Sequence, residues 1–336
     1  ESYLSSVLEQ CLTPMEPSQA KTYMEHTAIR MAEEAGAKGL WMTEHIGYRE
    51  SLVSCMAFAM RTKGTTVIPA AVTPYLFHPT PTAMSLATMA EAYPGRVGLS
   101  VAIGNTLDLK ESGKEPKDPV KLLENYVRDL RAMWTSEPVQ SETEAYNLAG
   151  ARMSFKTEQV IPIYVTALGS EVASKAGEIA DGVLMSAGFS VPFVQNCLKN
   201  FREGAVKVGR DISTLRTAAF IHFSVSEDGF SAREEVRRKL AFLFRNRLMA
   251  ENIACSGISI DQDAIVDAVA ARDLDKAATY VPDEAIEAFG VAGTVAECIK
   301  SLDAYVGTGL DEPVIQVAGN EAAKALALQV IREFTM

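Results

Sequence analysis

Histidine is scarce in this chain, and one of its four histidines ends a short apolar run, Lys38-Gly-Leu-Trp-Met-Thr-Glu-His45. The imidazole is the side chain best suited to moving a proton near neutral pH. His45 therefore qualifies as a proton donor or acceptor at the end of a buried strand, although a histidine that only anchors a loop fits this placement equally well. Glu44 should point to the opposite face of the strand, where its carboxylate would hold a neighbouring helix.

Small side chains gather near the end of another apolar run. The stretch Pro69-Ala-Ala-Val-Thr-Pro74 contains Ala71, Val72 and Thr73, and such residues let a flat ring come close to the backbone. On pattern alone, a strand end followed by a turn explains this stretch better. His78, in the loop that follows, is predicted to have a structural role.

A third run, starting at Arg96, has one face nearly free of side-chain bulk. Along it Gly98, Ser100 and Ala102 alternate with larger apolar residues. The side chain of a neighbour or a ligand must fill the space over such a face. Asn105 follows this run and carries an amide that could bind the edge of a ring.

Two glycine-containing loops each follow an apolar run and precede a helical pattern. The residues concerned are Leu168, Gly169 and Ser170 in the first loop, and Ser186, Ala187 and Gly188 in the second. Free N–H groups and the dipole at a helix N-terminus favour anions, and glycine permits close approach. Ser170 and Ser190 could instead be ordinary N-caps. Two such loops together favour a phosphate site.

The elements that must position these residues alternate between short β-rich runs and helical ones. Eight runs are predicted to be strands: Tyr3–Leu8, Lys38–Thr43, Thr65–Val72, Arg96–Ile103, Pro162–Ala167, Gly182–Ser186, Ala218–Ser224 and Pro313–Val317. This alternation indicates a parallel sheet with helical crossovers. Eight such units favour a closed (β/α)8 TIM barrel over an open Rossmann-like sheet, because no GxGxxG follows the first strand. His45 then lies on the C-terminal rim, where barrel active sites are built.

Helical patterns separate these strands. They cover Ser18–Ala35, Leu52–Arg61, Pro81–Ala92, Val120–Trp134, Ser170–Ala180, Pro192–Val208, Ala232–Asn246 and Ala322–Phe334. Thr294 and Glu297 form a capping-box pattern that opens one more helix. Pro138–Phe155 breaks the alternation as a hairpin or an excursion over the far end of the barrel. Arg247–Ala292 is predicted to be a mainly helical insertion before the last strand, and residues 1–336 to be one domain.

Composition narrows the functional classes. The formal net charge is −11, which argues against nucleic-acid binding because that needs a basic surface. The five cysteines are widely spaced and odd in number, which fits a reduced, cytoplasmic protein. No apolar run is long enough to cross a bilayer, and the N-terminus shows no signal-peptide pattern.

Sequence motifs typical of serine hydrolases, of P-loop nucleotide-binding proteins and of zinc proteases are missing. The sequence contains no GxSxG, Walker A or HExxH motif and no plausible metal cluster, so hydrolytic metal chemistry is not expected. A barrel mouth, two phosphate loops and one histidine suit a bound organic cofactor that supplies the chemistry itself.

Taken together, these motifs resemble the bacterial luciferase-like superfamily of flavin and deazaflavin enzymes. Within it, the likeness is greatest to the methylenetetrahydromethanopterin reductase branch. The resemblance rests on Gly39–His45, Pro69–Thr73, Gly95-Arg96 with the strand that follows, Pro138–Phe155, Pro162–Gly169, Ala180–Gly182 and Gly293-Thr294. It covers nearly the whole chain and is more specific for the superfamily than for any substrate.

The resemblance implies FMN or coenzyme F420 at the C-terminal rim, with its phosphate near the loops after strands five and six, and usually a homodimer. It implies that His45 is a catalytic base or hydrogen-bond partner and that Thr166 lies in the cofactor site with the candidates above. It also implies a non-prolyl cis peptide at Ala71–Val72 behind the cofactor ring. Ser100 and Ala102 replace glycines of the family pattern, so ligand contacts there are open.

Two chemistries follow from this resemblance. The chain is predicted to be a monooxygenase that uses reduced FMN and oxygen on a small organic substrate, with the reduced flavin supplied by a separate reductase. The alternative is an F420-dependent reductase or dehydrogenase in which oxygen plays no part. A flavin-binding protein without turnover is a third possibility, against which a rim imidazole argues. The charged loop Asn105–Pro119 is assigned to solubility or subunit contact, with contact to the substrate as the alternative.

Overall fold

The computed structural model describes residues 5–7 and 27–335. In this part of the chain, eight parallel strands build a barrel: β1 (Ser5–Val7), β2 (Gly39–Thr43), β3 (Thr66–Ala70), β4 (Leu99–Val101), β7 (Ile163–Ala167), β8 (Gly182–Met185), β9 (Arg216–Val225) and β11 (Glu312–Val317). They pair in the order β3-β2-β1-β11-β9-β8-β7-β4. Parallel bridges at Val67–Val97 and Val72–Val101 join β3 to the fourth-strand segment and close the ring. The predicted barrel is confirmed.

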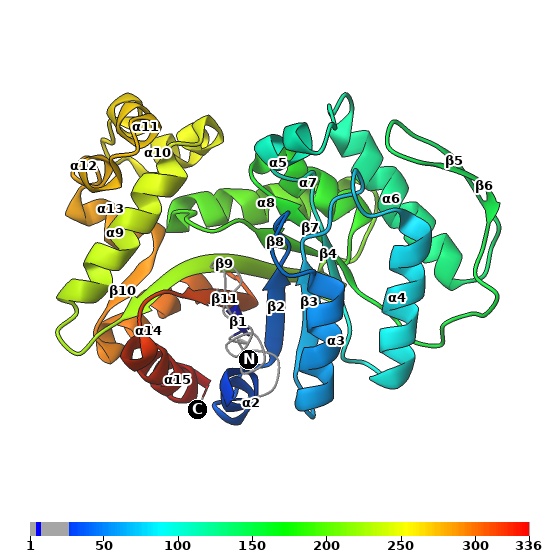
Figure 1. Ribbon diagram of the computed structural model, residues 1–336, viewed down its shortest axis with the longest axis horizontal. Helices are drawn as coiled ribbons and strands as arrows, with labels where there is room; N and C mark the ends of the chain where they lie inside the picture. The colour runs from blue at the N-terminus through cyan, green and yellow to red at the C-terminus, as the bar shows by residue number, and fades with distance from the viewer. Residues whose placement is uncertain (1–4, 8–26, 336) are drawn as a thin grey trace.

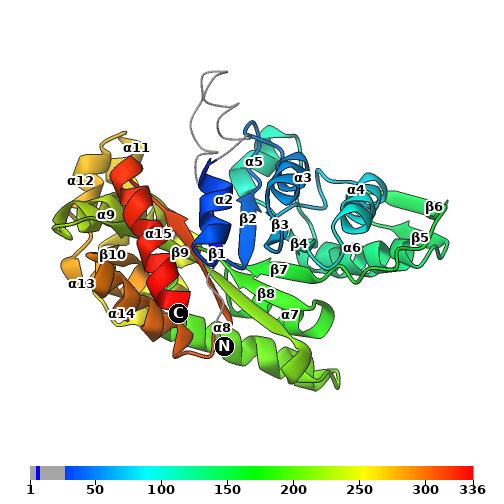
Figure 2. The ribbon, with the colours of Figure 1, turned by 90° about the horizontal axis from the view of Figure 1, so that it is seen from below.

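Helices cover the outside of these strands (Figures 1 and 2). They are α2 (Thr27–Glu34), α3 (Ser51–Arg61), α4 (Pro79–Ala92), α6 (Pro119–Trp134), α7 (Ser170–Ile179), α8 (Val191–Lys207), α9 (Phe230–Phe244), α14 (Val295–Val306) and α15 (Glu321–Thr335). Each matches a predicted helix within about two residues, apart from α2. The rest of the helix predicted at Ser18–Ala35, and the ends of the strand predicted at Tyr3–Leu8, lie outside the described residues.

Along the barrel strands whose side chains are described, from β2 onward, apolar residues divide between two cores. The inner core fills the barrel and contains Trp41, Ile68, Ala70, Tyr164, Leu184, Ala187, Ala218, Phe220 and Val314. The outer core, which is much larger, packs the other face of the strands against the helices. Trp41 meets the rings of Tyr164 and Phe220 edge-on, and its indole N–H donates to Glu312 Oε1 at 2.8 Å. The barrel is therefore closed below its C-terminal rim, as packed barrels of this size are.

Two segments depart from the βα rhythm. β5 (Val139–Glu142) and β6 (Asn147–Ala151) form the antiparallel hairpin predicted within Pro138–Phe155. Residues 247–292 hold η3 (Arg247–Met249), α10 (Ala250–Ser256), α11 (Gln262–Ala270), α12 (Leu274–Ala278) and α13 (Asp283–Phe289). The short β10 (Val291–Gly293) then adds to β9. Figure 1 shows these helices gathered beside α9, on the side of the molecule away from the hairpin.

Three smaller features complete the fold. Thr294 and Glu297 form the predicted capping box at the start of α14. α5 (Thr106–Glu111), after β4, was not predicted. None of the helices in the described residues has the length and apolar character needed to cross a membrane.

The cis peptide was predicted one bond too late. The structure has a non-prolyl cis bond at Ala70–Ala71, so the prediction at Ala71–Val72 was wrong. The β2–β3 ladder ends at this point, where Glu44 N donates to Ala70 O at 3.1 Å. From Val72 onward the backbone pairs with the fourth strand instead.

Candidate active site

His45 lies at the C-terminal end of β2, on the inner side of the barrel mouth. Trp41 faces the inner core; β2 ends at Thr43, and extending its alternation by two residues past that end puts His45 on the same side. His45 is half-buried, and its ring meets Tyr48 edge-on with 6.2 Å between centroids. The placement on the rim follows the prediction.

Burial holds the pKa of His45 below its ordinary value, and the negative charge of Asp108 acts in the opposite direction. The imidazole is therefore uncharged at neutral pH and available as a proton acceptor. Asp108 belongs to α5, in the loop that was assigned to solubility or subunit contact. Its influence on His45 brings this loop to the candidate site.

Glu44 points away from the mouth, as predicted. Its carboxylate accepts a hydrogen bond from Ser51 N at 2.8 Å and so holds the first turn of α3. Burial raises the pKa of this carboxyl, while the contacts with Ser51 oppose the shift. Glu44 is thus a structural partner of a helix.

Ala71, Val72 and Thr73, which follow β3 and were predicted to lie against the cofactor ring, divide between the mouth and the outer core. Ala71 is half-exposed, whereas Val72 is fully buried among outer-core residues. Thr73 is also buried, and its hydroxyl donates to Ile103 O at 2.7 Å, which ties the β3 loop to the β4 loop. Of these three candidates, Ala71 alone is open to the mouth.

The fourth strand supplies the small inner face that the sequence predicts. A side chain on Gly98 would touch Ile68, so a neighbour fills that level of the barrel. One level higher, the hydroxyls of Ser100 and Thr166 bond to each other at 2.8 Å. Ala102 is half-exposed above them.

Asn105 lies at the far end of this wall. It is exposed, and its Oδ1 accepts from Leu107 N at 2.9 Å as the N-cap of α5. His78 likewise caps α4, where its Nδ1 accepts from Thr80 N, in line with its predicted structural role.

The first glycine loop contains a carboxylate from elsewhere in the chain. Gly169 is the N-cap of α7 and offers no side-chain bond, so Ser170 is the first helical residue. The hydroxyl of Ser170 donates to Glu251 Oε1 at 2.9 Å and accepts from Asn196 Nδ2 at 3.0 Å. A Cβ on Gly169 would lie 3.5 Å from Glu251 Oε2. A negative group at a helix N-terminus is favourable, and here the protein provides its own.

The second loop is tied down by the next residue of α10. Asn252 is buried; its Oδ1 accepts from Ser190 N at 2.9 Å, and its Nδ2 donates to Gly188 O at 2.8 Å. Gly188 has a φ of +73°, and a Cβ there would come within 2.1 Å of Leu243 Cδ2. The left-handed backbone conformation therefore explains this glycine, because the leucine side-chain tip could move aside. Ser190 is the N-cap of α8, as the structural alternative predicted.

The remaining candidates of these loops differ in exposure. Ala187 belongs to the inner core, Ser186 is half-buried and Leu168 is exposed. Leu168 and Ser186 therefore border the mouth, whereas Ala187 packs beneath it.

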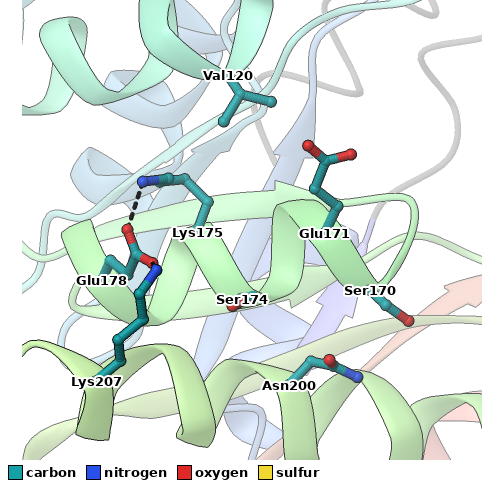
Figure 3. A pocket seen from close by; sticks show the side chains of 8 residues that line it. All are labelled: Val120, Ser170, Glu171, Ser174, Lys175, Glu178, Asn200 and Lys207. Atoms are coloured by element: carbon teal, nitrogen blue, oxygen red, sulfur yellow. Dashed lines mark hydrogen bonds and ion pairs between the residues drawn. The ribbon is translucent and has the colours of Figure 1, made fainter.

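A groove of about 360 Å³ runs along the outside of α7 and α8, with Ser170 at one end (Figure 3). Its two lysines, Lys175 and Lys207, both pair with Glu178, the second at 2.7 Å. This pairing leaves little positive charge to attract a phosphate, so the groove does not replace the predicted loops.

The residues at the mouth fit a flat ring better than they fit a phosphate. Ala71, Ala102 and the hydroxyls of Ser100 and Thr166 leave an inner wall without bulky side chains. At the first glycine loop, however, Glu251 must turn away before an anion can take its place. No cluster of metal-ligating side chains occurs among the residues that the structure describes.

Sequence reasoning missed three residues that face the barrel interior or contact the glycine loops: His222, Glu251 and Asn252. It named Asp108 only as part of the charged loop Asn105–Pro119. Glu251 and Asn252 are remote in sequence from the loops they contact, so no local pattern pointed to them. His222 follows Ala218 and Phe220 at steps of two along β9, and this inward alternation is the signal that could have found it.

Comparisons with known proteins bear on the family and the fold. The profile of the luciferase-like monooxygenase family matches residues 11–312. A 5,10-methylenetetrahydromethanopterin reductase of Archaeoglobus fulgidus is 26% identical over 298 residues, covering 88% of this chain and 89% of that protein. An F420-dependent glucose-6-phosphate dehydrogenase of Rhodococcus hoagii is 27% identical over 315 residues, covering 89% and 88%.

A solved structure shares the fold over the whole length. It is the coenzyme F420 dependent tetrahydromethanopterin reductase from Methanopyrus kandleri, with a TM-score of 0.84, 22% identity, and coverage of 98% of this chain and 97% of that one. With the family profile matched over most of its length, the chain belongs to the luciferase-like monooxygenase family and is an oxidoreductase.

Proposed function

We propose that this protein transfers hydride between coenzyme F420 and a small organic substrate at the barrel mouth. The observation that carries the proposal is His45, a half-buried imidazole at the end of β2 whose pKa is lowered by burial and which lies beside a wall of small residues. The choice of F420 is supported by the relatives, because the dehydrogenase and the solved reductase above are both named as F420-dependent.

When bound, F420 supplies two-electron hydride chemistry in which oxygen takes no part. The chain itself would position the ring and manage the proton. Ala71 and Ala102 leave room for a flat ring against β3 and β4, and the Ser100–Thr166 hydroxyl pair lies beneath it. His45 would accept a proton from a substrate that loses hydride and return it in the reverse direction.

Monooxygenase activity, the first of the two chemistries predicted from the sequence, remains a prediction. The family takes its name from that activity, but the full-length relatives reported above are a reductase and a dehydrogenase. The homodimer and the separate flavin reductase also stay predictions.

Cofactor titration tests the proposal. The purified protein is titrated with F420 and with FMN, oxidised and reduced, and quenching of cofactor fluorescence is followed. We expect F420 to bind, and turnover with a hydride acceptor or donor to proceed without oxygen. Binding of FMN alone, with turnover that requires oxygen, would restore the monooxygenase; binding of neither would defeat both.

A further inference from the structure

Two polar side chains on neighbouring strands each have a buried atom without a hydrogen-bond partner among the described residues. They are His222 on β9, through Nε2, and Gln316 on β11, through Oε1. The strand register pairs these two residues directly. Buried polar atoms in native proteins are nearly always hydrogen-bonded. Two buried atoms without a partner, called orphan atoms below, therefore call for an explanation when they occur at paired positions.

Both side chains face the inside of the barrel. His222 follows the inner-core residues Ala218 and Phe220 at steps of two, and Gln316 follows Val314 in the same way. A Cβ on Gly188 would lie 3.6 Å from the His222 ring, which places the imidazole beside the β8 loop. The pair therefore lies above the packed inner core, toward the mouth.

The pair also lies near the wall that carries His45. Trp41 Nε1 on β2 bonds Glu312 Oε1 on β11 at 2.8 Å across the intervening β1. Four residues beyond Trp41 comes His45, two residues past the end of β2, and four residues beyond Glu312 comes Gln316 on β11, so both lie toward the C-terminal ends of strands that β1 separates.

Neither side chain carries a charge at neutral pH. Burial lowers the pKa of His222 to about 4, and the charge of Lys239 on α9 adds to the shift. Gln316 has no ionisable group and is 8% exposed. Together an amide and a neutral imidazole can accept from an N–H and donate to a C=O, whereas they have no positive charge for a phosphate or carboxylate.

We propose that His222 and Gln316 form a subsite that binds the uncharged amide-like edge of a heterocyclic substrate, in which an N–H and a C=O stand side by side. The reaction carried out on that substrate rests on the proposed function. The subsite itself rests on the two orphan atoms.

The first test needs no ligand. Gln316→Leu removes a buried amide atom that has no partner in the free protein, so the variant should be more stable than the wild type. We expect a rise in Tm of about 2–4 °C by scanning calorimetry. Ser136→Ala removes another buried hydroxyl without a partner, in the turn after α6, and should also raise Tm, so it calibrates the gain from one such atom away from the pair. A lower Tm for Gln316→Leu would show that the amide has an internal partner and would overturn the subsite.

The second test measures the subsite at work. With reduced F420 and methylenetetrahydromethanopterin, whose pterin ring has the required edge, Gln316→Leu and His222→Leu should each raise KM about tenfold or more. The Kd for F420 should not change in either variant, and Ser136→Ala should match the wild type. Weakened F420 binding would reassign the pair to the cofactor. Turnover of glucose 6-phosphate and not of the pterin would overturn the substrate class.

Failure of the proposed function is distinguishable from failure of the subsite. If the wild type does not bind F420, the proposed function falls. The change in Tm on adding methylenetetrahydromethanopterin alone then tests the subsite. A rise in Tm for the wild type that is absent in Gln316→Leu supports the subsite. No rise in Tm for the wild type overturns the subsite.

Discussion

The two sides of the barrel mouth differ in how their polar groups are used. On the β2–β4 side, His45, Ala71 and Ala102 remain partly exposed. On the β7–β8 side, two consecutive residues of α10, Glu251 and Asn252, hydrogen-bond to both glycine loops. The same sequence pattern, small residues at strand ends, therefore leads to an open wall in one place and to loops occupied by the chain's own side chains in the other.

This difference separates a surface kept for a ligand from one that holds the fold together. A wall that keeps half-exposed small residues beside an imidazole gains little stability from them, which is typical of sites retained for function. The buried amide of Asn252, in contrast, satisfies two backbone groups that would otherwise lack partners. Substitutions on the two sides should consequently change different properties.

The largest effect is expected on the open side. His45→Ala should lower kcat about 100-fold or more, because a general acid–base group contributes on that scale. Cofactor affinity and Tm should stay near those of the wild type. Steady-state kinetics with the cofactor that binds, together with calorimetry, measure both. His78→Ala is the matched control, since His78 caps α4. Unchanged kcat in His45→Ala would return His45 to the role of a loop anchor.

On the β7–β8 side the main effect should be on stability. Asn252→Ala leaves Ser190 N and Gly188 O unpaired in a buried place, which should cost about 2 kcal/mol of unfolding free energy. Denaturant unfolding measures this loss, and kcat of the folded fraction should change little. Asn200→Ala is the control, because among the described residues the Asn200 amide donates to Asn196 of the same helix. Equal stabilities for the two variants would remove the distinction between the two sides.

A smaller effect tests whether the first glycine loop takes an anion at all. Glu251→Gln keeps a hydrogen-bond acceptor for Ser170 but removes the negative charge beside the α7 N-terminus. If the cofactor phosphate binds there, its Kd should fall about fivefold, which corresponds to about 1 kcal/mol of repulsion between charges near 4 Å in water.

Glu171→Gln is the control for that experiment, since Glu171 lies in the same first turn and points away from Ser170 (Figure 3). Equal effects of both substitutions would indicate a general charge effect. No effect of Glu251→Gln would place the phosphate elsewhere.

Sequence alone was sufficient for the barrel because its information is local. Strand alternation, helix periodicity and the capping box at Thr294 are each set by residues close in the chain. Some residues that carry the family resemblance turn out to be structural for equally plain reasons. Asp181 accepts from Ile163 N at 2.8 Å, and a Cβ on Gly182 would collide with the Tyr164 ring.

The site was harder to predict because its contacts span long distances in sequence. Glu251 reaches Ser170 across 81 residues, and Gln316 pairs with His222 through strand register. Val72 was assigned to the cofactor site together with its neighbours Ala71 and Thr73, although it packs in the outer core.

The smallest effect concerns the proton at His45. Burial lowers the pKa of His45, and Asp108 partly restores it. An imidazole that must accept a proton works above its pKa and stops working as the pH falls through it, so the acid limb of kcat/KM should lie below the ordinary pKa of histidine. Asp108→Asn removes the charge that raises this pKa. The acid limb should therefore move to lower pH, with no change at neutral pH.

The matched control is Glu111→Gln, which removes a carboxylate from the same short helix. The charge of Asp108 is the one that raises the pKa of His45, so Glu111→Gln should leave the acid limb in place. A profile of kcat/KM between acid and neutral pH for both variants decides the matter. A shift to higher pH in Asp108→Asn, or equal shifts in both variants, would mean that the limb belongs to another group. A shift confined to Asp108→Asn would tie the acid limb to His45 and assign the α5 loop to the open side of the mouth.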